Sequence, residues 1–319
     1  MQIDPPILQQ CWFLAGPTAV GKTAVGIALA PRIGAEIIAL DSMTLYRGMD
    51  IGTAKPSTGE RDAVPHHLLD VLDPHEDFSV GQYLEMADRT CREILARERV
   101  PLFVGGTGLY LRALLRGIFE GPAADWEFRR KLEAECRDCG PASLHERLQQ
   151  VDPLAAERLP AADVRRVVRA LEIHHLTGRP ASEQQQQAPL APDERPPHVY
   201  WLHPPRDWLR DRIDRRVREM FAAGLVDEVR QLAAAPGGMG RTARQGLGYK
   251  EVLEHLAGEC TVEEAIDQLQ RRTRQFAKRQ HTWFRNLVEC REIAITGEET
   301  PEQVAETIVR LGQESQRAD

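Results

Sequence analysis

The spacing of apolar residues changes repeatedly along the first 120 residues of the chain. Short apolar runs predict buried strands, and they alternate with stretches in which apolar residues recur every three or four positions, which predict helices. This alternation is typical of a parallel α/β sheet flanked by helices. The expected strands cover residues 8–15, 36–40, 67–72 and 101–105, and the expected helices cover residues 21–30, 80–97 and 109–116.

After residue 124 the strand-like runs disappear for about 70 positions. Helical spacing at residues 125–139, 142–150 and 163–177 predicts an inserted helical subdomain, residues 125–195, which ends in a polar, proline-rich linker. The flanking segments, 1–124 and 196–319, should form the α/β core together. In the second segment we expect one more strand at 198–203, then helices at 206–221, 225–235, 249–257, 262–287 and 301–311.

The turn between the first expected strand and the first expected helix fits the phosphate-loop pattern of Gly, four residues, then Gly-Lys-Thr. Glycine lets the backbone present several N–H groups to one anion, and the N-terminus of the helix adds partial positive charge. A di- or triphosphate is therefore the expected ligand, although this loop alone does not separate an ATPase, a kinase and a diphosphate-releasing transferase. The expected phosphate-binding residues are Gly16, Pro17, Thr18, Ala19, Val20, Gly21, Lys22 and Thr23, and the Thr23 hydroxyl is also the expected Mg²⁺ ligand.

Polar residues follow two further expected strands. Asp41 and Ser42 come directly after the second, and Gly105-Gly106-Thr107 ends the fourth. Ligands of open α/β sheets gather at the carboxyl ends of strands, so these segments and the phosphate loop should face one crevice. Asp41 has three candidate roles there: it can bind magnesium, orient the nucleophile of a kinase, or take a proton from the nucleophile of another group transfer.

The composition is that of a soluble globular protein, with 42% hydrophobic and 28% charged residues among 319. No stretch approaches the ~20 apolar residues that a membrane span needs. The first residues do not resemble a signal peptide, and the six cysteines are scattered, so we expect a cytoplasmic protein. A monomer is also expected, although the sequence does not determine the oligomeric state. Cys136 and Cys139 lack a second pair at zinc spacing, which favours two thiols on one helix face over a metal site.

The net charge of −7 conceals three clusters of basic residues. Residues 271–285 include six Lys or Arg and no acidic residue. Three clusters of one sign near a phosphate site favour a polyanionic partner over ordinary solvated helix faces. The other two clusters are Arg158, Arg165, Arg166 and Arg169, and Arg241, Arg244 and Lys250.

Longer motifs make the interpretation more specific, because together they resemble the bacterial form of tRNA dimethylallyltransferase, also called tRNA isopentenyltransferase. The chain departs from many members at Thr44, where Gln is common, and at Gly246-Leu247, which replaces Ala-Ile. No zinc-finger-like Cys/His segment follows residue 288. The motifs that carry the resemblance are, in order, residues 41–46, 52–56, 65–68, 105–110, 165–172, 212–216, 246–251 and 277–285.

This resemblance implies a P-loop NTPase-like fold. It also implies transfer of a dimethylallyl group from dimethylallyl diphosphate to N6 of adenosine 37, in tRNAs that read codons beginning with U, with release of diphosphate. Asp41 would take the amine proton, Thr107 would donate a hydrogen bond to the bridging oxygen, and Arg216 would help Lys22 and Mg²⁺ to stabilise the leaving diphosphate. The residues expected to contact tRNA are Asp41, Ser42, Met43, Thr44, Thr107, Arg129, Arg165, Arg166, Arg169, Arg244, Gly248, Tyr249, Lys250, Lys278 and Arg279.

An adenine N6 amine is inaccessible inside a stacked loop, so the base would have to be flipped into the crevice. We expect the inserted helices and the basic helix at 271–285 to clamp the anticodon stem-loop from two sides. The alternatives are an isopentenyltransferase acting on free adenylate, a P-loop small-molecule kinase, and a non-catalytic RNA-binding module. We expect structural roles for His66 and His67. We expect Trp283 and Phe284 to anchor the core rather than stack on bases. Lys55 is expected to contact phosphate or RNA.

Overall fold

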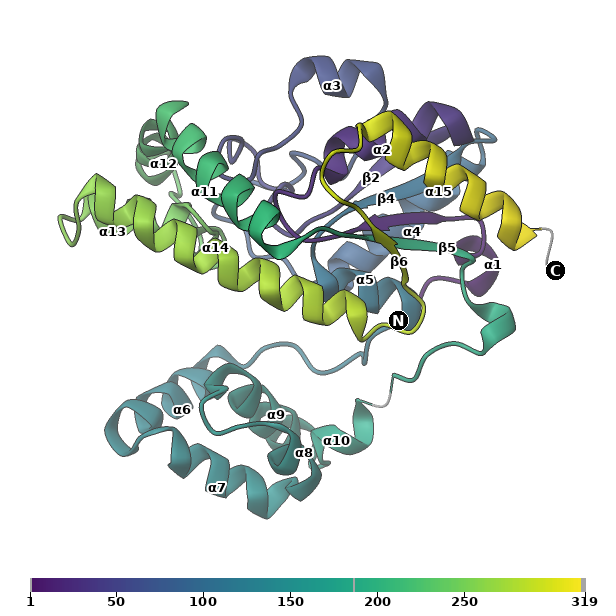
Figure 1. Cartoon of the computed structure of the whole chain (residues 1–319). Helices are drawn as coiled ribbons and strands as arrows, with labels where there is room; N and C mark the ends of the chain where they lie inside the picture. Colours follow the sequence, from purple (N-terminus) through teal and green to yellow (C-terminus); the bar gives the residue numbers. More distant parts are fainter. Residues whose placement is uncertain (1, 186, 317–319) are drawn as a thin grey trace. The chain divides into compact units, whose positions relative to one another are not determined.

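Figure 1 shows the computed structural model of the chain, which describes residues 2–185 and 187–316. They divide into two compact units: a helical unit, Arg116–Ala188, and a core unit that combines Gln2–Leu115 with the chain from Pro189 onward. The helical unit begins before the expected residue 125, because Phe119 packs against its apolar core and Arg169 donates to the Pro122 carbonyl.

The core unit is built on one six-stranded sheet in which every pairing is parallel (Figure 1). The strand order is β3-β2-β4-β1-β5-β6. The central strands are almost wholly buried, as is usual for a parallel sheet covered on both faces. The strands are β1 Trp12–Ala15, β2 Ala35–Leu40, β3 His66–His67, β4 Val100–Gly105, β5 His198–His203 and β6 Arg291–Ala294.

Alternate residues of each strand point to opposite faces of the sheet, and each face has its own cover. On one face, Leu14 and Leu102 share a core with Leu29 of helix α2 and Ile308 of helix α15. On the other face, the ring of Trp201 lies 6.1 Å, between centroids, from the ring of Phe284 near the end of helix α14. The helices that flank the sheet are α2 Lys22–Ile33, α4 Val80–Leu95, α5 Gly108–Arg116, α14 Val262–Arg285 and α15 Pro301–Gln316.

A further group of helices in the core unit packs around the loop that follows β2. Tyr46 and Met49 of this loop are fully buried against Val229 and Leu269. This packing fixes the loop that carries Asp41 relative to the C-terminal helices. The remaining elements of the core unit are α1 Pro5–Leu8, α3 Thr58–Ala63, η1 Pro192–Glu194, α11 Arg206–Ala222, α12 Leu225–Ala234, η2 Ala243–Gln245 and α13 Tyr249–Leu256.

The helical unit has an apolar core of its own. Leu132, Leu148 and Val167 from three different helices are almost completely buried in it. Its elements are α6 Trp126–Cys139, α7 Pro141–Val151, α8 Pro153–Arg158, α9 Val164–Thr177 and α10 Ala181–Gln184. Among the described residues of the whole chain, no helix is both long and apolar enough to cross a membrane.

The structure differs from the sequence-based expectations at the margins of the sheet. The strand expected at 67–72 is wrong beyond His67, because Leu68 and Asp70 adopt left-handed backbone with φ of 58° and 54°. The expected strand at 8–15 begins only at Trp12, after a short helix. Edge strand β6 was not anticipated, because Ile293 is its one buried residue and its pattern is therefore polar.

Candidate functional site

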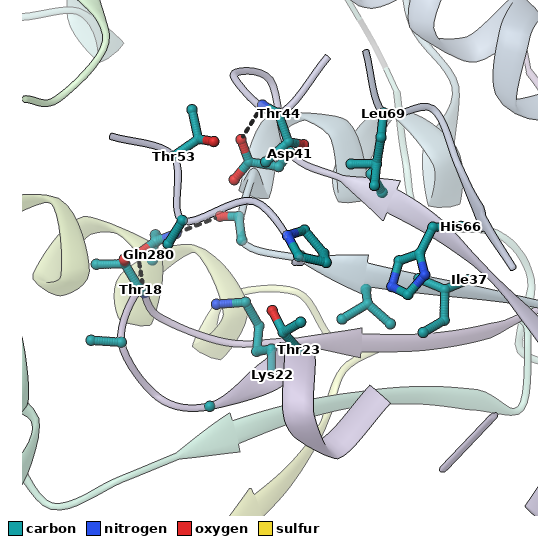
Figure 2. Close-up of a pocket in the computed structure, with 18 of the residues that line it drawn as sticks. Thr18, Lys22, Thr23, Ile37, Asp41, Thr44, Thr53, His66, Leu69 and Gln280 are labelled. Atoms are coloured by element: carbon teal, nitrogen blue, oxygen red, sulfur yellow. Dashed lines mark hydrogen bonds between the residues drawn. The ribbon is translucent and has the colours of Figure 1, made fainter. Parts of the chain in front are cut away.

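A cavity of about 150 Å³ lies at the carboxyl ends of β2 and β4 (Figure 2). All of its lining residues belong to the core unit. Figure 2 shows Lys22, Thr23 and Gln280 toward one end of the cavity, and Arg216, which also lines it, is close enough to Lys22 to affect its charge. The other end is lined mainly by carbon. Asp41 also lines the cavity, and Figure 2 shows its carboxylate apart from the apolar end.

The phosphate loop connects β1 to α2 through a backbone conformation that residues with a side chain rarely adopt. Ala19 has φ of 64° and Gly21 has φ of 102°, both in the left-handed region. A non-glycine residue in this conformation costs about 1–2 kcal/mol, and it persists only when its surroundings fix it. Arg212 is one such surrounding group, because its Nε donates to the Ala19 carbonyl at 2.9 Å. The loop is therefore held in the shape that directs the first N–H groups of α2 at the cavity.

Two cations share this end of the cavity. The Nζ of Lys22 donates to the Pro17 carbonyl at 2.7 Å. Burial, and after it the neighbouring Arg216, lower the pKa of Lys22 to about 7, while Asp41 acts in the opposite direction. Burial also lowers the pKa of Arg216. Burial in a low-dielectric site and mutual repulsion both disfavour the charged forms, and a bound anion would relieve both effects.

Asp41 is positioned by a turn immediately after β2. Its Oδ1 accepts hydrogen bonds from the backbone N–H of Met43 at 2.8 Å and of Thr44 at 3.4 Å. The neighbouring Ser42 N–H donates to Thr107 Oγ1 at 3.1 Å. The Thr107 oxygen acts there as acceptor, so its own proton is not used in this contact. The turn after β2 thus places the Asp41 carboxylate at the cavity, whereas Thr107, held through Ser42, is not among the residues that line it.

Thr44 lines the cavity, and its Oγ1 is buried without a hydrogen-bond partner among the residues that the structure describes. A buried polar atom left unpaired costs about 1–3 kcal/mol. Such an atom is well suited to accept or donate a hydrogen bond when a polar ligand enters.

Ile37 and Leu69 form the apolar end, with His66 beside them (Figure 2), and the apolar side chains of Ala39 and Val104 also line the cavity. Burial lowers the pKa of His66, so its ring is neutral at neutral pH. Its Nδ1 lies 2.7 Å from the Val64 carbonyl, which fixes the ring in the wall. This end therefore suits a small hydrocarbon group and offers no charge to it.

His67 and Lys55 have structural partners. His67 Nε2 lies 2.7 Å from Glu36 Oε2. Lys55, expected to contact phosphate or RNA, is instead buried and donates to the Tyr46 carbonyl, Asp50 and Asp70. These contacts hold the loop whose residues 53, 54 and 56 line the cavity. The expectation for Lys55 is thus replaced by a role in positioning that loop.

Several of the expected RNA-contacting residues lie inside the protein. Tyr249 is 1% exposed, and its hydroxyl donates to Glu228 at 2.6 Å. The same carboxylate accepts from the backbone N–H groups of residues 50, 51 and 52. Gly248 is also buried, and its N–H donates to Glu251. Direct RNA contact by the Tyr249 side chain is therefore not supported, and this residue instead fixes the loop after β2.

Arg129 and Arg169 of the helical unit bind one buried acid, Glu172. Arg129 donates to both carboxylate oxygens, at 2.7 and 2.8 Å, and Arg169 also pairs with this carboxylate. These ion pairs hold α6 and α9 together. The other cationic residues expected to contact RNA lie at or near the surface: Arg165, Arg166, Arg244, Lys278 and Arg279 are exposed, and Lys250 is half-buried.

Sequence reasoning missed Phe276 and Gln280, which line the cavity from α14. The guanidinium of Arg279 lies over the Phe276 ring, 5.7 Å from its centroid. Gln280 is only 4% exposed although it lies among basic residues of a long helix, and its residue type gives no sign of this burial in the sequence.

Comparisons with known proteins agree with this geometry. A family model described as IPP transferase matches residues 44–287, and one described as isopentenyl transferase matches residues 9–70. A tRNA dimethylallyltransferase of Anaeromyxobacter dehalogenans is 50% identical over 272 residues, which cover 85% of this chain and 90% of that protein. A tRNA dimethylallyltransferase of Pelotomaculum thermopropionicum is 42% identical over 301 residues, covering 93% and 94%.

Solved structures resemble the whole chain. The full-length tRNA isopentenylpyrophosphate transferase of Bacillus halodurans has 40% identity and a TM-score of 0.69, with 97% of this chain and 99% of that chain covered. A eukaryotic dimethylallyltransferase acting on tRNA has 28% identity and a TM-score of 0.71, covering 90% and 74%. The expected P-loop NTPase-like fold is confirmed, and the tRNA-enzyme interpretation is favoured over the kinase and free-adenylate alternatives.

Proposed function

Because the chain belongs to the IPP transferase family of prenyltransferases, we propose that it transfers a dimethylallyl group from dimethylallyl diphosphate to a tRNA. The acceptor is N6 of adenosine 37 in tRNAs that read codons beginning with U, and the leaving group is diphosphate. The observation that carries the proposal is the two-ended cavity. A cationic phosphate loop lies at one end and a neutral apolar wall at the other, which is the chemistry of a donor with a charged head and a five-carbon tail.

The diphosphate would bind to the loop N–H groups, Lys22 and Arg216. As the allylic C–O bond breaks, its electron pair moves to the bridging oxygen, and negative charge grows on the diphosphate. Preorganised donors stabilise such charge more in the transition state than in the ground state. Thr107, whose hydroxyl proton is not used in its contact with Ser42, would donate to the bridging oxygen.

The acceptor would reach the allylic carbon from the side of Asp41. The lone pair of an adenine N6 amine is delocalised into the ring, so the amine gains nucleophilicity only as it loses a proton. Asp41 would take this proton while the C–N bond forms, which is general base catalysis. The turn that fixes Oδ1 through the N–H groups of Met43 and Thr44 keeps the carboxylate in place for this step.

Mg²⁺ is the proposed cofactor. The Thr23 hydroxyl lines the cavity beside Lys22, and among the described residues no cluster of three or more His, Cys, Asp or Glu could hold a metal. This donor set fits Mg²⁺, which is commonly bound by one or two protein oxygens together with substrate phosphates. When bound, the ion would neutralise part of the diphosphate charge.

The tRNA would be held by exposed cations, with Arg165 and Arg166 on the helical unit and Arg244, Lys278 and Arg279 on the core unit. The structural comparison supports this partner, because the eukaryotic neighbour acts on tRNA. Flipping the target base out of the anticodon loop would bring its amine to the cavity.

Transfer of radiolabelled dimethylallyl from its diphosphate to an anticodon stem-loop tests the proposal. Label should enter a stem-loop with adenosine at position 37 and should not enter one with inosine there, which lacks the exocyclic amine. Equal labelling of free adenylate would favour the adenylate alternative. Phosphoryl transfer from ATP to a small molecule, with no prenyl transfer, would overturn the proposal.

A further inference from the structure

Gln280 of α14 makes two hydrogen bonds to the catalytic end of the sheet. Its Oε1 accepts from the Thr18 N–H at 2.8 Å, and its Nε2 donates to the Gly106 carbonyl at 2.8 Å (Figure 2). One orientation of the amide satisfies both partners, since Thr18 supplies a donor and Gly106 an acceptor. Gln280 is only 4% exposed, so water cannot reach these groups, and the two hydrogen bonds satisfy groups that solvent would otherwise satisfy.

The turn after β4 is shaped to receive this amide. A Cβ at position 106 would lie 2.4 Å from Gln280 Nε2, so the contact requires glycine there. The same turn holds Thr107, whose Oγ1 accepts from Ser42 beside Asp41. The side-chain amide of Gln280 therefore joins the phosphate loop to the turn after β4, which orients the proposed catalytic groups.

The helical turn of α14 that carries Gln280 also exposes two cationic side chains to solvent. Lys278 and Arg279 directly precede Gln280 and are exposed, whereas Gln280 faces inward. A helix is a rigid element, so a small shift of this turn moves the outward cations and the inward amide together. Thr18 and Gly106 would then shift with it.

We propose that Gln280 is a positioning residue that couples RNA binding on α14 to donor binding in the phosphate loop; this rests on the proposed function. RNA docked on Lys278 and Arg279 fixes the position of α14, the amide then fixes Thr18, and the loop binds diphosphate more tightly. Linkage requires the reverse effect to be of equal size, so bound donor tightens RNA binding by the same factor.

The experiment measures a coupling factor, which is the Kd of a donor analogue without RNA divided by its Kd with saturating anticodon stem-loop. The probe is the S-thiolo analogue of dimethylallyl diphosphate, in which sulfur replaces the bridging oxygen and slows ionisation. In the wild-type protein the factor should be about fivefold or more, the lower end of typical couplings. In Gln280→Met, which keeps the side-chain volume and removes both hydrogen bonds, it should fall to about one.

Gln270→Met is the matched control. Gln270 lies on the same helix, is 7% exposed, and donates to the Asp214 carbonyl of α11 at 3.0 Å, away from the phosphate loop. This variant should lose comparable packing and keep the wild-type coupling factor. Gln280→Glu is a second variant. It still accepts from Thr18 but places a carboxylate oxygen against the Gly106 carbonyl, so it should also lose coupling.

The outcomes separate the two proposals. Coupling of wild-type size in Gln280→Met or Gln280→Glu would overturn the inference while leaving the prenyl-transfer assay of the wild-type protein intact. A wild-type coupling factor of one would overturn it equally. Loss of coupling in Gln270→Met to the same extent would assign the effect to helix packing. Failure of the wild-type protein to prenylate the stem-loop would reject the proposed function instead.

Discussion

Donor binding should draw a proton onto Lys22. In the free protein, burial and the neighbouring Arg216 lower the pKa of Lys22 to about 7. A bound diphosphate adds negative charge beside Nζ and should return the pKa toward the ordinary lysine value of about 10.4. Between these two pH values the complex holds a proton that the free protein lacks. Donor affinity should therefore fall as pH rises through this range.

The size of the effect follows from the free-state pKa. With a pKa of about 7, about 0.9 of Lys22 is deprotonated at pH 8 and about 0.1 at pH 6, so binding should take up about 0.9 and about 0.1 proton, respectively. Titration calorimetry in two buffers with different ionisation enthalpies measures this number directly. The donor's own phosphate ionisation contributes equally to any variant that binds it in the same way.

Lys22→Arg is the control, because arginine keeps the charge and does not titrate in this range. The variant should bind the donor more weakly, and its proton uptake at pH 8 should drop to the donor's own contribution. If it takes up as many protons as the wild-type protein, the titrating group is not Lys22, and the assignment of the low pKa is refuted.

Four further outcomes are expected. Asp41→Asn should lower the rate of prenyl transfer by about 10²–10⁴ with donor Kd little changed, as befits loss of a general base; wild-type turnover would exclude that role. Tyr249→Phe should lower the free energy of unfolding by about 1 kcal/mol, because Glu228 loses a hydrogen bond, and it should leave the affinity for stem-loop nearly unchanged. Leu69→Ala should extend the apolar end of the cavity and improve the kcat/KM of a ten-carbon donor relative to the five-carbon one; an unchanged ratio would place the prenyl tail elsewhere. Lys278→Ala and Arg279→Ala should each reduce the slope of log affinity against log salt for RNA by about 0.7–0.9, whereas a flat plot in the wild-type protein would contradict ionic contacts.

The sequence was sufficient for the centre of the fold and for the phosphate end of the site. Strand 198–203 and the residues of β2 and β4 were predicted almost to the residue, because a buried parallel strand is a continuous apolar run. The phosphate loop was equally plain, since its glycines and lysine meet fixed backbone and charge requirements within eight positions.

Other features depend on partners far away in the chain. Tyr249 carries no local sign that its hydroxyl meets Glu228 and that both fix residues 50–52. Lys55 is a residue type that commonly contacts phosphate, yet its ammonium group is surrounded by two acids and a carbonyl from residues 46–70. Periodicity describes how an element faces its core, but it does not say which distant polar group completes a hydrogen bond.

The division between these two classes has a physical basis in the cavity itself. A phosphate site brings together like charges and left-handed backbone, so Lys22 and Ala19 are both held in unfavourable states. Groups elsewhere must supply the compensation. Arg212 fixes the Ala19 carbonyl, and Gln280 fixes the Thr18 N–H from 262 positions away. The motifs thus suggest roles for the residues expected to meet the ligand, whereas the roles of Arg212 and Gln280, which lie within motifs, become apparent only from the distant loop groups that they hold.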